Sequence, residues 1–303
     1  MIDAVNDAVL DAVLDAVIDA LVNLAHYAGL TVAIGAVAMR VLVLSRCGLS
    51  VSERAPPARD AARAGLWGAV LILVAAPARA LVQVATLAEP DETWMPLFQA
   101  VLGTSVGKAL QLQAIWAAAA IVAFAVARQG RDRGWKVASI ALVILALTPG
   151  LAGHAATSAS PTLALAAAML HVLGAGLWIG GLFHLWRLSG PSSDMTLQRA
   201  LAAFHPVALG GTALLALSGA YHVWSILGAP SDLVATAWGR LLALKLALVA
   251  AALMLGYRHW KTAEQSVSGG DRAAARRSLA REAIIALTVI GVTAILTVTE
   301  KPF

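Results

Sequence analysis

Long apolar segments constrain this chain more than any other feature of its sequence. We identify eight, over residues 20–44, 63–87, 106–127, 136–153, 162–187, 200–227, 235–257 and 280–299. Their lengths are close to the roughly 20 residues that a helix needs to cross a bilayer. Only 13% of the 303 residues are charged, about half the share in a soluble domain. The chain is therefore predicted to be an all-α integral membrane protein with eight transmembrane helices. An ordinary soluble enzyme, a disordered chain and an outer-membrane barrel are excluded.

Basic residues gather in alternate loops. Sixteen of the 22 Lys and Arg residues lie in or beside the loops that follow the first, third, fifth and seventh segments. Because cytoplasmic loops are enriched in Lys and Arg, we expect these loops and Cys47 on the cytoplasmic side and both termini in the periplasm. The same distribution explains the net charge of +5 without a nucleic-acid partner. Residues 1–19 form an acidic N-terminal extension, interpreted as a solvated helical lead-in, an over-extended start or a cation-gathering arm.

Two motifs occur twice. Residues 26–35 and 171–180 both read H-x-x-G-x4-I-G, and residues 104–113 and 236–245 both read T-x-x-G-[K/R]-x-L-x-L-[Q/K]. Four segments in each half would give both halves the same orientation, as in parallel repeats about an axis along the membrane normal. We therefore expect two four-helix halves, residues 20–153 and 154–303. His26 and His171 would be equivalent and would face each other near the axis.

Histidines supply most of the candidate ligands for a metal. In the expected topology, four lie toward the periplasm: His26, His154, His171 and His222. Another three, His184, His205 and His259, lie toward the cytoplasm. Ionisable groups in a membrane are functional candidates by default, and imidazole suits copper among other metals. A thiolate-built site is excluded because the chain has one cysteine.

The four outer histidines therefore form a predicted metal site, with copper passing from His154 to His26 and His171. The alternative is that the imidazoles are neutral hydrogen-bond partners between helices.

Paired histidines also suggest a b-type haem, with His171 opposite His222 and His184 opposite His205. At about 100° per residue, His171 and His184 point in directions about 220° apart, and His205 and His222 about 260° apart. Straight helices therefore do not offer one face for two haems. Pro206 can bend its helix, so the haem alternative stays open at this point.

Short motifs follow one another through the second half in a specific order. They are Gly153-His154-Ala155, Leu170-His171, residues 177–182 (L-W-I-G-G-L), Ala203-Phe204, Ser218-Gly219, residues 236–242 (T-A-W-G-R-L-L) with Lys245, Arg277-Ser278-Leu279 with Glu282, and Lys301-Pro302. Together they resemble the CopD family of bacterial copper-resistance membrane proteins, over about residues 150–303 and more loosely before them. One departure is Phe204-His205-Pro206, where the family has Phe-Ser.

The resemblance implies a multi-pass inner-membrane protein with eight helices, in which copper moves from the periplasm toward the cytoplasm. It also implies a CopC-like periplasmic copper carrier as a partner, besides the lipid bilayer. On this basis we expect a copper-handling protein that is not an enzyme. Two other readings remain: a membrane b-type cytochrome, and a membrane partner that docks a periplasmic protein without carrying metal.

Overall fold

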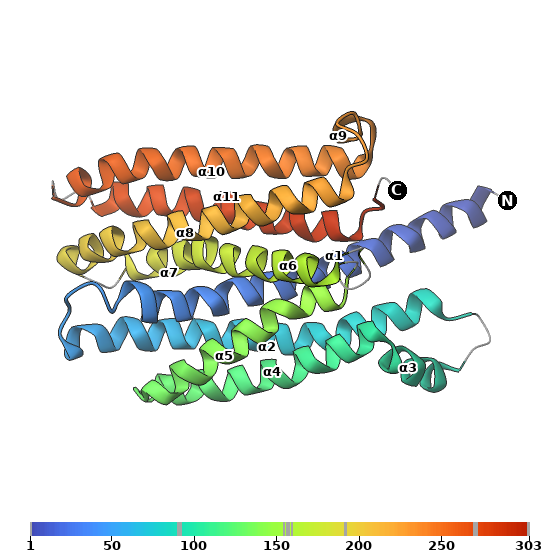
Figure 1. Cartoon of the computed structure of the whole chain (residues 1–303), viewed down its shortest axis with the longest axis horizontal. Coiled ribbons are helices and arrows are strands. Elements are labelled where there is room, and N and C mark those ends of the chain that lie inside the picture. The colour runs from blue at the N-terminus through green and yellow to red at the C-terminus, as the bar shows by residue number, and fades with distance from the viewer. Residues whose placement is uncertain are drawn as a thin grey trace.

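A computed structural model describes residues 2–89, 93–153, 155, 158, 160–190, 193–268 and 272–301. Every regular element in these ranges is helical (Figure 1). The elements are α1 (Ile2–Ala38), η1 (Met39–Val43), α2 (Val51–Leu87), α3 (Trp94–Gly103), α4 (Ser105–Arg128), α5 (Asp132–Leu151), α6 (Pro161–Ala175), η3 (Gly176–Gly180), α7 (Gly181–Leu188), α8 (Asp194–Ile226), α9 (Asp232–Ala235), α10 (Ala237–Ser268) and α11 (Arg272–Val298). Elements η1 and η3 are single π-helical turns that continue α1 and α6.

Eight helical stretches within the described ranges are long and apolar enough to cross a membrane. They are Ala12–Val43, Val51–Leu87, Ser105–Arg128, Asp132–Leu151, Pro161–Leu188, Met195–Ile226, Ala237–Arg258 and Ala273–Val298. Each overlaps the predicted segment of the same rank, so the all-α membrane fold is confirmed. We number them spans 1 to 8.

Helix boundaries differ from the prediction where polar residues continue a helix. Helix α1 runs without a break through the acidic extension, and α2 begins at Val51, before its apolar part. Ser50 caps α2: its Oγ accepts from the backbone N–H of Glu53, and the Glu53 carboxylate accepts from the N–H of Ser50. This reciprocal capping favours an early helix start. The short helices α3 and α9 were not predicted.

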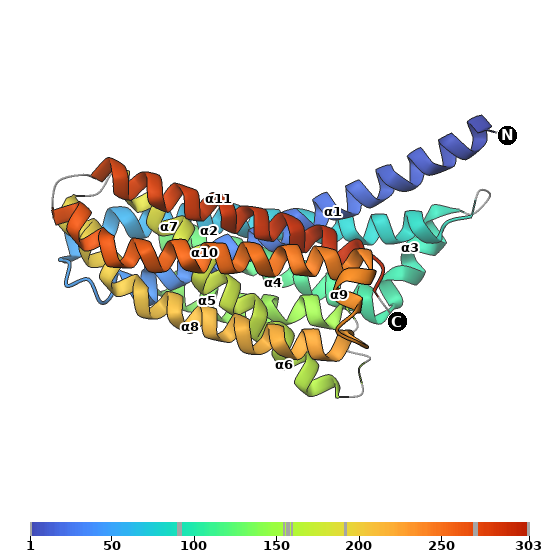
Figure 2. The ribbon, with the colours of Figure 1, turned by 90° about the horizontal axis from the view of Figure 1, so that it is seen from above.

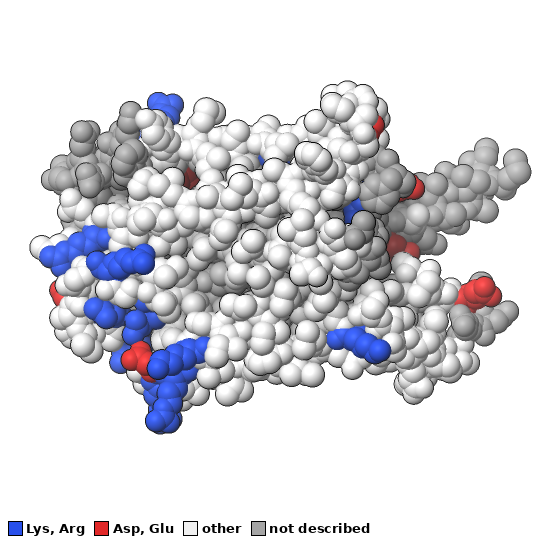
Figure 3. All heavy atoms as spheres, in the orientation of Figure 1, with Lys and Arg blue, Asp and Glu red and all other residues white. Residues whose placement is uncertain are grey.

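Both described ends of the chain lie at the same end of the bundle as α3 and α9 (Figures 1 and 2). Lys and Arg side chains concentrate at the opposite end, on the left in Figure 3. The loops expected in the cytoplasm therefore share one end of the molecule, and the termini share the other.

Helix α1 is central to the packing. It contacts α2 and α5 of its own half, and α6, η3, α7 and α11 of the other half. At the crossing of spans 1 and 5, Gly35 packs on the backbone of Gly180, and Gly180 packs on the carbonyl oxygen of Thr31. Neither glycine has room for a Cβ atom, so the I-G ends of the two H-x-x-G motifs meet each other. Glycine commonly permits such close approach of membrane helices.

The T-x-x-G motifs have the same local structure at the starts of α4 and α10. Thr104 Oγ1 accepts from the backbone N–H of Gly107 at 3.0 Å, and Thr236 Oγ1 accepts from that of Gly239 at 2.9 Å. Each threonine caps its helix, which satisfies an N–H that would otherwise lack a partner. Both glycines pack against the preceding short helix, α3 or α9. The repeated sequence thus encodes a repeated corner.

Candidate functional site

Paired glycines bring the first two spans of each half together next to the H-x-x-G histidine. A Cβ on Gly29 would lie 2.6 Å from the carbonyl oxygen of Gly68, and one on Gly174 would lie 2.7 Å from that of Gly211. His26 and His171 lie three residues before Gly29 and Gly174. Each histidine therefore lies close to the crossing of its helix with the next span.

In the second half, His171 of α6 and His222 of α8 form a cluster. Their ring centroids are 5.7 Å apart and the rings are nearly perpendicular. His171 Nδ1 is 3.0 Å from Ser218 Oγ, one helical turn before His222 on α8. Both imidazoles are half-buried. Two imidazoles from neighbouring helices therefore lie within reach of one small ligand.

Hydrogen bonds determine which ring nitrogen of His171 is free. Ser218 Oγ lies 2.5 Å from the carbonyl oxygen of Leu214, which can only accept, so the hydroxyl proton goes there. Ser218 Oγ then accepts from Nδ1–H of His171, and Nε2 keeps its lone pair. Outer hydrogen bonds of this kind orient imidazole ligands in metal sites. The backbone of Ala167 lies near His222 and acts on its imidazole.

Lys245 is a cation near this cluster, and the charge of Lys301 also acts on His222. Lys245 lies on α10, and its charge acts on both His171 and His222. It occupies the last position of the second T-x-x-G motif, where the first copy has Gln113. Gln113 is buried, and its Nε2 donates to the carbonyl oxygen of Ile72 at 3.2 Å. The two copies therefore differ in charge at a matched position.

The first half has a different cluster around His26. Its imidazole is fully buried and stacks edge-on against Tyr27, with ring centroids 5.2 Å apart. Among the described residues, neither ring nitrogen of His26 has a hydrogen-bond partner, and neither does the buried Nη1 of Arg79. The Arg79 charge acts on His26, Tyr27 and Asp19. Asp19 also accepts from Asn23 Nδ2 at 2.9 Å, one turn before His26.

Of the predicted site residues, the structure brings His171 and His222 together. The neighbours of His26 just described come from the first half, and those of His171 from the second. His154 lies outside the described residues, as does the side chain of His259. Among the described residues, no group of three or more His, Cys, Asp or Glu is placed to hold a metal ion.

The inner histidines have other contacts. His184 is buried, and its Nε2 donates to the carbonyl oxygen of Val32 in α1 at 3.0 Å. Nearby on α7, Arg187 forms a two-bonded ion pair with Asp60 of α2, at 2.9 and 2.6 Å. These contacts join the two halves at the basic end of the bundle. His205 is half-buried on α8. The haem alternative pairs His171 with His222 as well as His184 with His205, and it gains no support here.

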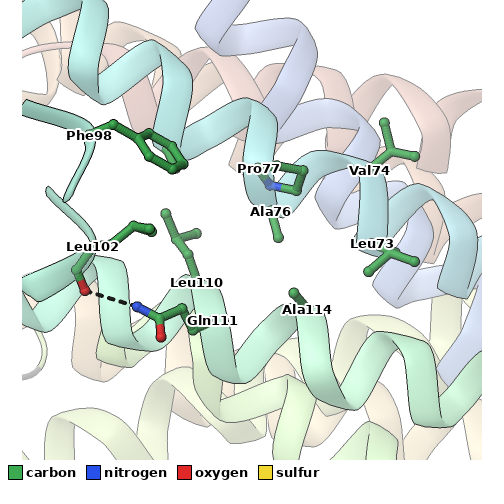
Figure 4. A pocket seen from close by; sticks show the side chains of 10 residues that line it. Leu73, Val74, Ala76, Pro77, Phe98, Leu102, Leu110, Gln111 and Ala114 are labelled. Carbon is green, nitrogen blue, oxygen red and sulfur yellow. Dashed lines mark hydrogen bonds between the residues drawn. The ribbon is translucent and has the colours of Figure 1, made fainter. Parts of the chain in front are cut away.

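A cavity of about 450 Å³ lies elsewhere, between α2, α3 and α4 (Figure 4). Its walls are almost wholly apolar, and the one polar side chain on them, Gln111, donates to the carbonyl oxygen of Leu102 at 2.9 Å. The cavity has no imidazole or carboxylate that would bind a metal.

Comparisons with known proteins cover both halves of the chain. The family model described as Copper resistance protein D-like, N-terminal domain matches residues 13–162, and that described as Copper resistance protein D matches residues 198–296. Copper transport protein CutJ of Bacillus subtilis is 27% identical over 176 residues, which are 55% of this chain and 31% of that protein. The chain thus matches about a third of the length of this relative. No solved structure matches. The eight apolar helices and the two family matches agree: the chain belongs to the CopD family of copper-resistance proteins, and it is a multi-pass protein of the bacterial inner membrane.

Proposed function

We propose that this protein carries copper through the inner membrane from the periplasm toward the cytoplasm, and that His171 and His222 bind the ion on the way. The observation that carries the proposal is the paired imidazoles, with Ser218 orienting one of them. Imidazole nitrogen is a suitable ligand for copper, and two such ligands can hold Cu(I) in a near-linear site. The copper-related family supports the choice of metal over haem.

The proposed direction depends on the proposed topology. The loops rich in Lys and Arg lie at one end of the bundle, which we place in the cytoplasm, and both termini then lie in the periplasm. Spans 1 and 5 run in parallel in this arrangement. Matched glycine pairs and matched threonine caps support two parallel repeats of four spans.

Copper reaches the pair from the periplasmic side in this proposal. His154 precedes α6 in the sequence and is a proposed first acceptor, from free copper or from a CopC-like carrier. The protein acts as a carrier rather than as an enzyme. The Arg187–Asp60 ion pair and the bond from His184 to Val32 lie at the opposite end, where copper would leave.

Copper binding and uptake by variants test the proposal. We expect His171→Ala and His222→Ala each to lower the affinity of the purified protein for Cu(I) at least tenfold, and to lower copper uptake by cells that depend on it. Ser225→Ala is a matched control, because Ser225 lies one turn after His222 and is exposed, and its hydroxyl donates to the backbone carbonyl of His222. Unchanged binding and uptake in folded histidine variants would contradict the proposed site. A Soret band in the purified protein would favour haem instead.

A further inference from the structure

The two polar clusters occupy matched positions in the two halves. Arg79 lies 11 residues after Gly68, and His222 lies 11 residues after Gly211. Since Gly68 packs on Gly29, and Gly211 packs on Gly174, the same contact relates each pair to its histidine. Arg79 therefore occupies the position relative to His26 that His222 occupies relative to His171.

Two observations agree with this counting. The ring centroids of His171 and His222 are 5.7 Å apart, and Arg79 lies near enough to His26 for its charge to act on that imidazole. The first half thus has one imidazole and one guanidinium where the second has two imidazoles. A guanidinium is always protonated and has no lone pair for a metal.

His26 itself is available for binding. Both of its ring nitrogens are buried and lack partners among the described residues, and a neutral imidazole has one nitrogen with a lone pair. The failure of this cluster to provide a copper site would therefore come from Arg79 and not from His26. Lys245 also brings a positive charge to the second cluster, but its ammonium is on a flexible stem of four carbons and occupies neither ligand position.

We propose that Arg79 keeps copper out of the first half, so that each chain holds one copper ion between spans 5 and 6 and none between spans 1 and 2. Arg79 is thus a specificity-determining residue, which leaves the His26 cluster to hydrogen-bonding ligands such as water. This inference rests on the proposed copper site at His171 and His222.

Copper stoichiometry in four purified variants tests the inference, with Cu(I) supplied from a buffered chelator. Wild type and His26→Ala should both bind one ion per chain. Arg79→His should bind two, because it supplies the missing imidazole. Arg79→Gln, which removes the charge without adding a ligand, should stay at one. The double variant Arg79→His, His26→Ala should return to one.

Two results would overturn the inference. One is a wild-type protein that binds two ions and loses one on His26→Ala; the other is a folded Arg79→His variant that still binds one. If Arg79→His does not fold, the wild type and His26→Ala still decide, because a second ion in the wild type that is lost with His26 contradicts the assigned role. A second ion gained by Arg79→Gln would support exclusion by Arg79, through its charge. Failure of the proposed function looks different: the one ion in the wild type would survive loss of His171 and His222.

Discussion

The two proposed halves of the molecule have matching local contacts at their glycines and threonine caps but differ in the side chains around their histidines. Each has a histidine three residues before a glycine that packs on the next span, and each has a threonine-capped third span. Around His171 the bond to Ser218 leaves a ring nitrogen with a lone pair for a ligand, whereas His26 is fully buried and lies near the charge of Arg79. Glycines where the helices cross preserve the backbone geometry. Substitution at a few polar positions can then change what each site binds without changing the helix packing.

The largest expected effect concerns the scaffold. Gly29→Ala and Gly174→Ala should each lower the free energy of unfolding by about 1–3 kcal/mol, because the added methyl group meets a backbone oxygen of the facing span. Thermal unfolding in detergent measures this. Gly210→Ala is the control, since a Cβ there meets nothing within 4 Å, and the better helix propensity of alanine should make it neutral or stabilising. If one of the two variants lost much of its free energy of unfolding and the other lost none, the structural match between the halves would be contradicted.

An intermediate effect concerns the bond that orients His171. Ser218→Ala should weaken copper binding about 10- to 100-fold, as is typical when an outer hydrogen bond to a metal ligand is removed, while the protein stays folded. Equilibrium titration against a chelator of known affinity measures this. Ser218→Thr, which keeps the hydroxyl, should recover most of the affinity. Equal affinities for wild type and Ser218→Ala would show that this bond does not prepare the site.

The smallest effect concerns Cys47 and the orientation of the halves. This thiol is buried and donates to the carbonyl oxygen of Val43 at 3.2 Å. Burial raises its pKa, against the opposing effect of Arg54 and Arg199. Because the thiolate is the reactive form, labelling should be slow at neutral pH and should accelerate as pH rises toward that raised value.

Labelling of two exposed positions, one near the start of α2 and one near the start of α8, compares the orientation of the two halves. On a Cys47→Ser background, Ser52→Cys and Met195→Cys should label quickly, and only from the cytoplasmic side. Labelling of the two from opposite sides of the membrane would rule out parallel halves.

The sequence predicted the spans well and the site only in part. The eight apolar segments were visible because lipid requires long apolar helices. Helices α3 and α9 were missed, since elements this short leave a weak pattern beside long spans. The sequence already paired His171 with His222, in the haem alternative and within the predicted metal site. The contact itself depends on how α6 and α8 rotate against each other where Gly174 packs on Gly211.

Other features of the site had signals that could have been used. The alignment of the two T-x-x-G motifs in the sequence already places Lys245 opposite Gln113. Ser218 was noted only as part of the family pattern, because its bond to His171 joins residues 47 positions apart. The equivalence of Arg79 and His222 can be recognised only from the contacts of Gly68 and Gly211. No motif in the sequence predicts these contacts.

X-ray absorption at the copper edge tests the central claim most directly, because it counts and identifies the atoms bound to copper. In the Cu(I)-loaded wild-type protein, the spectrum should show two imidazole nitrogens, and the copper signal should fall in the double variant His171→Ala, His222→Ala after the same loading and washing. The same spectrum and copper content in that folded double variant, or a wild-type spectrum dominated by sulfur ligands, would contradict the assignment of copper to this pair.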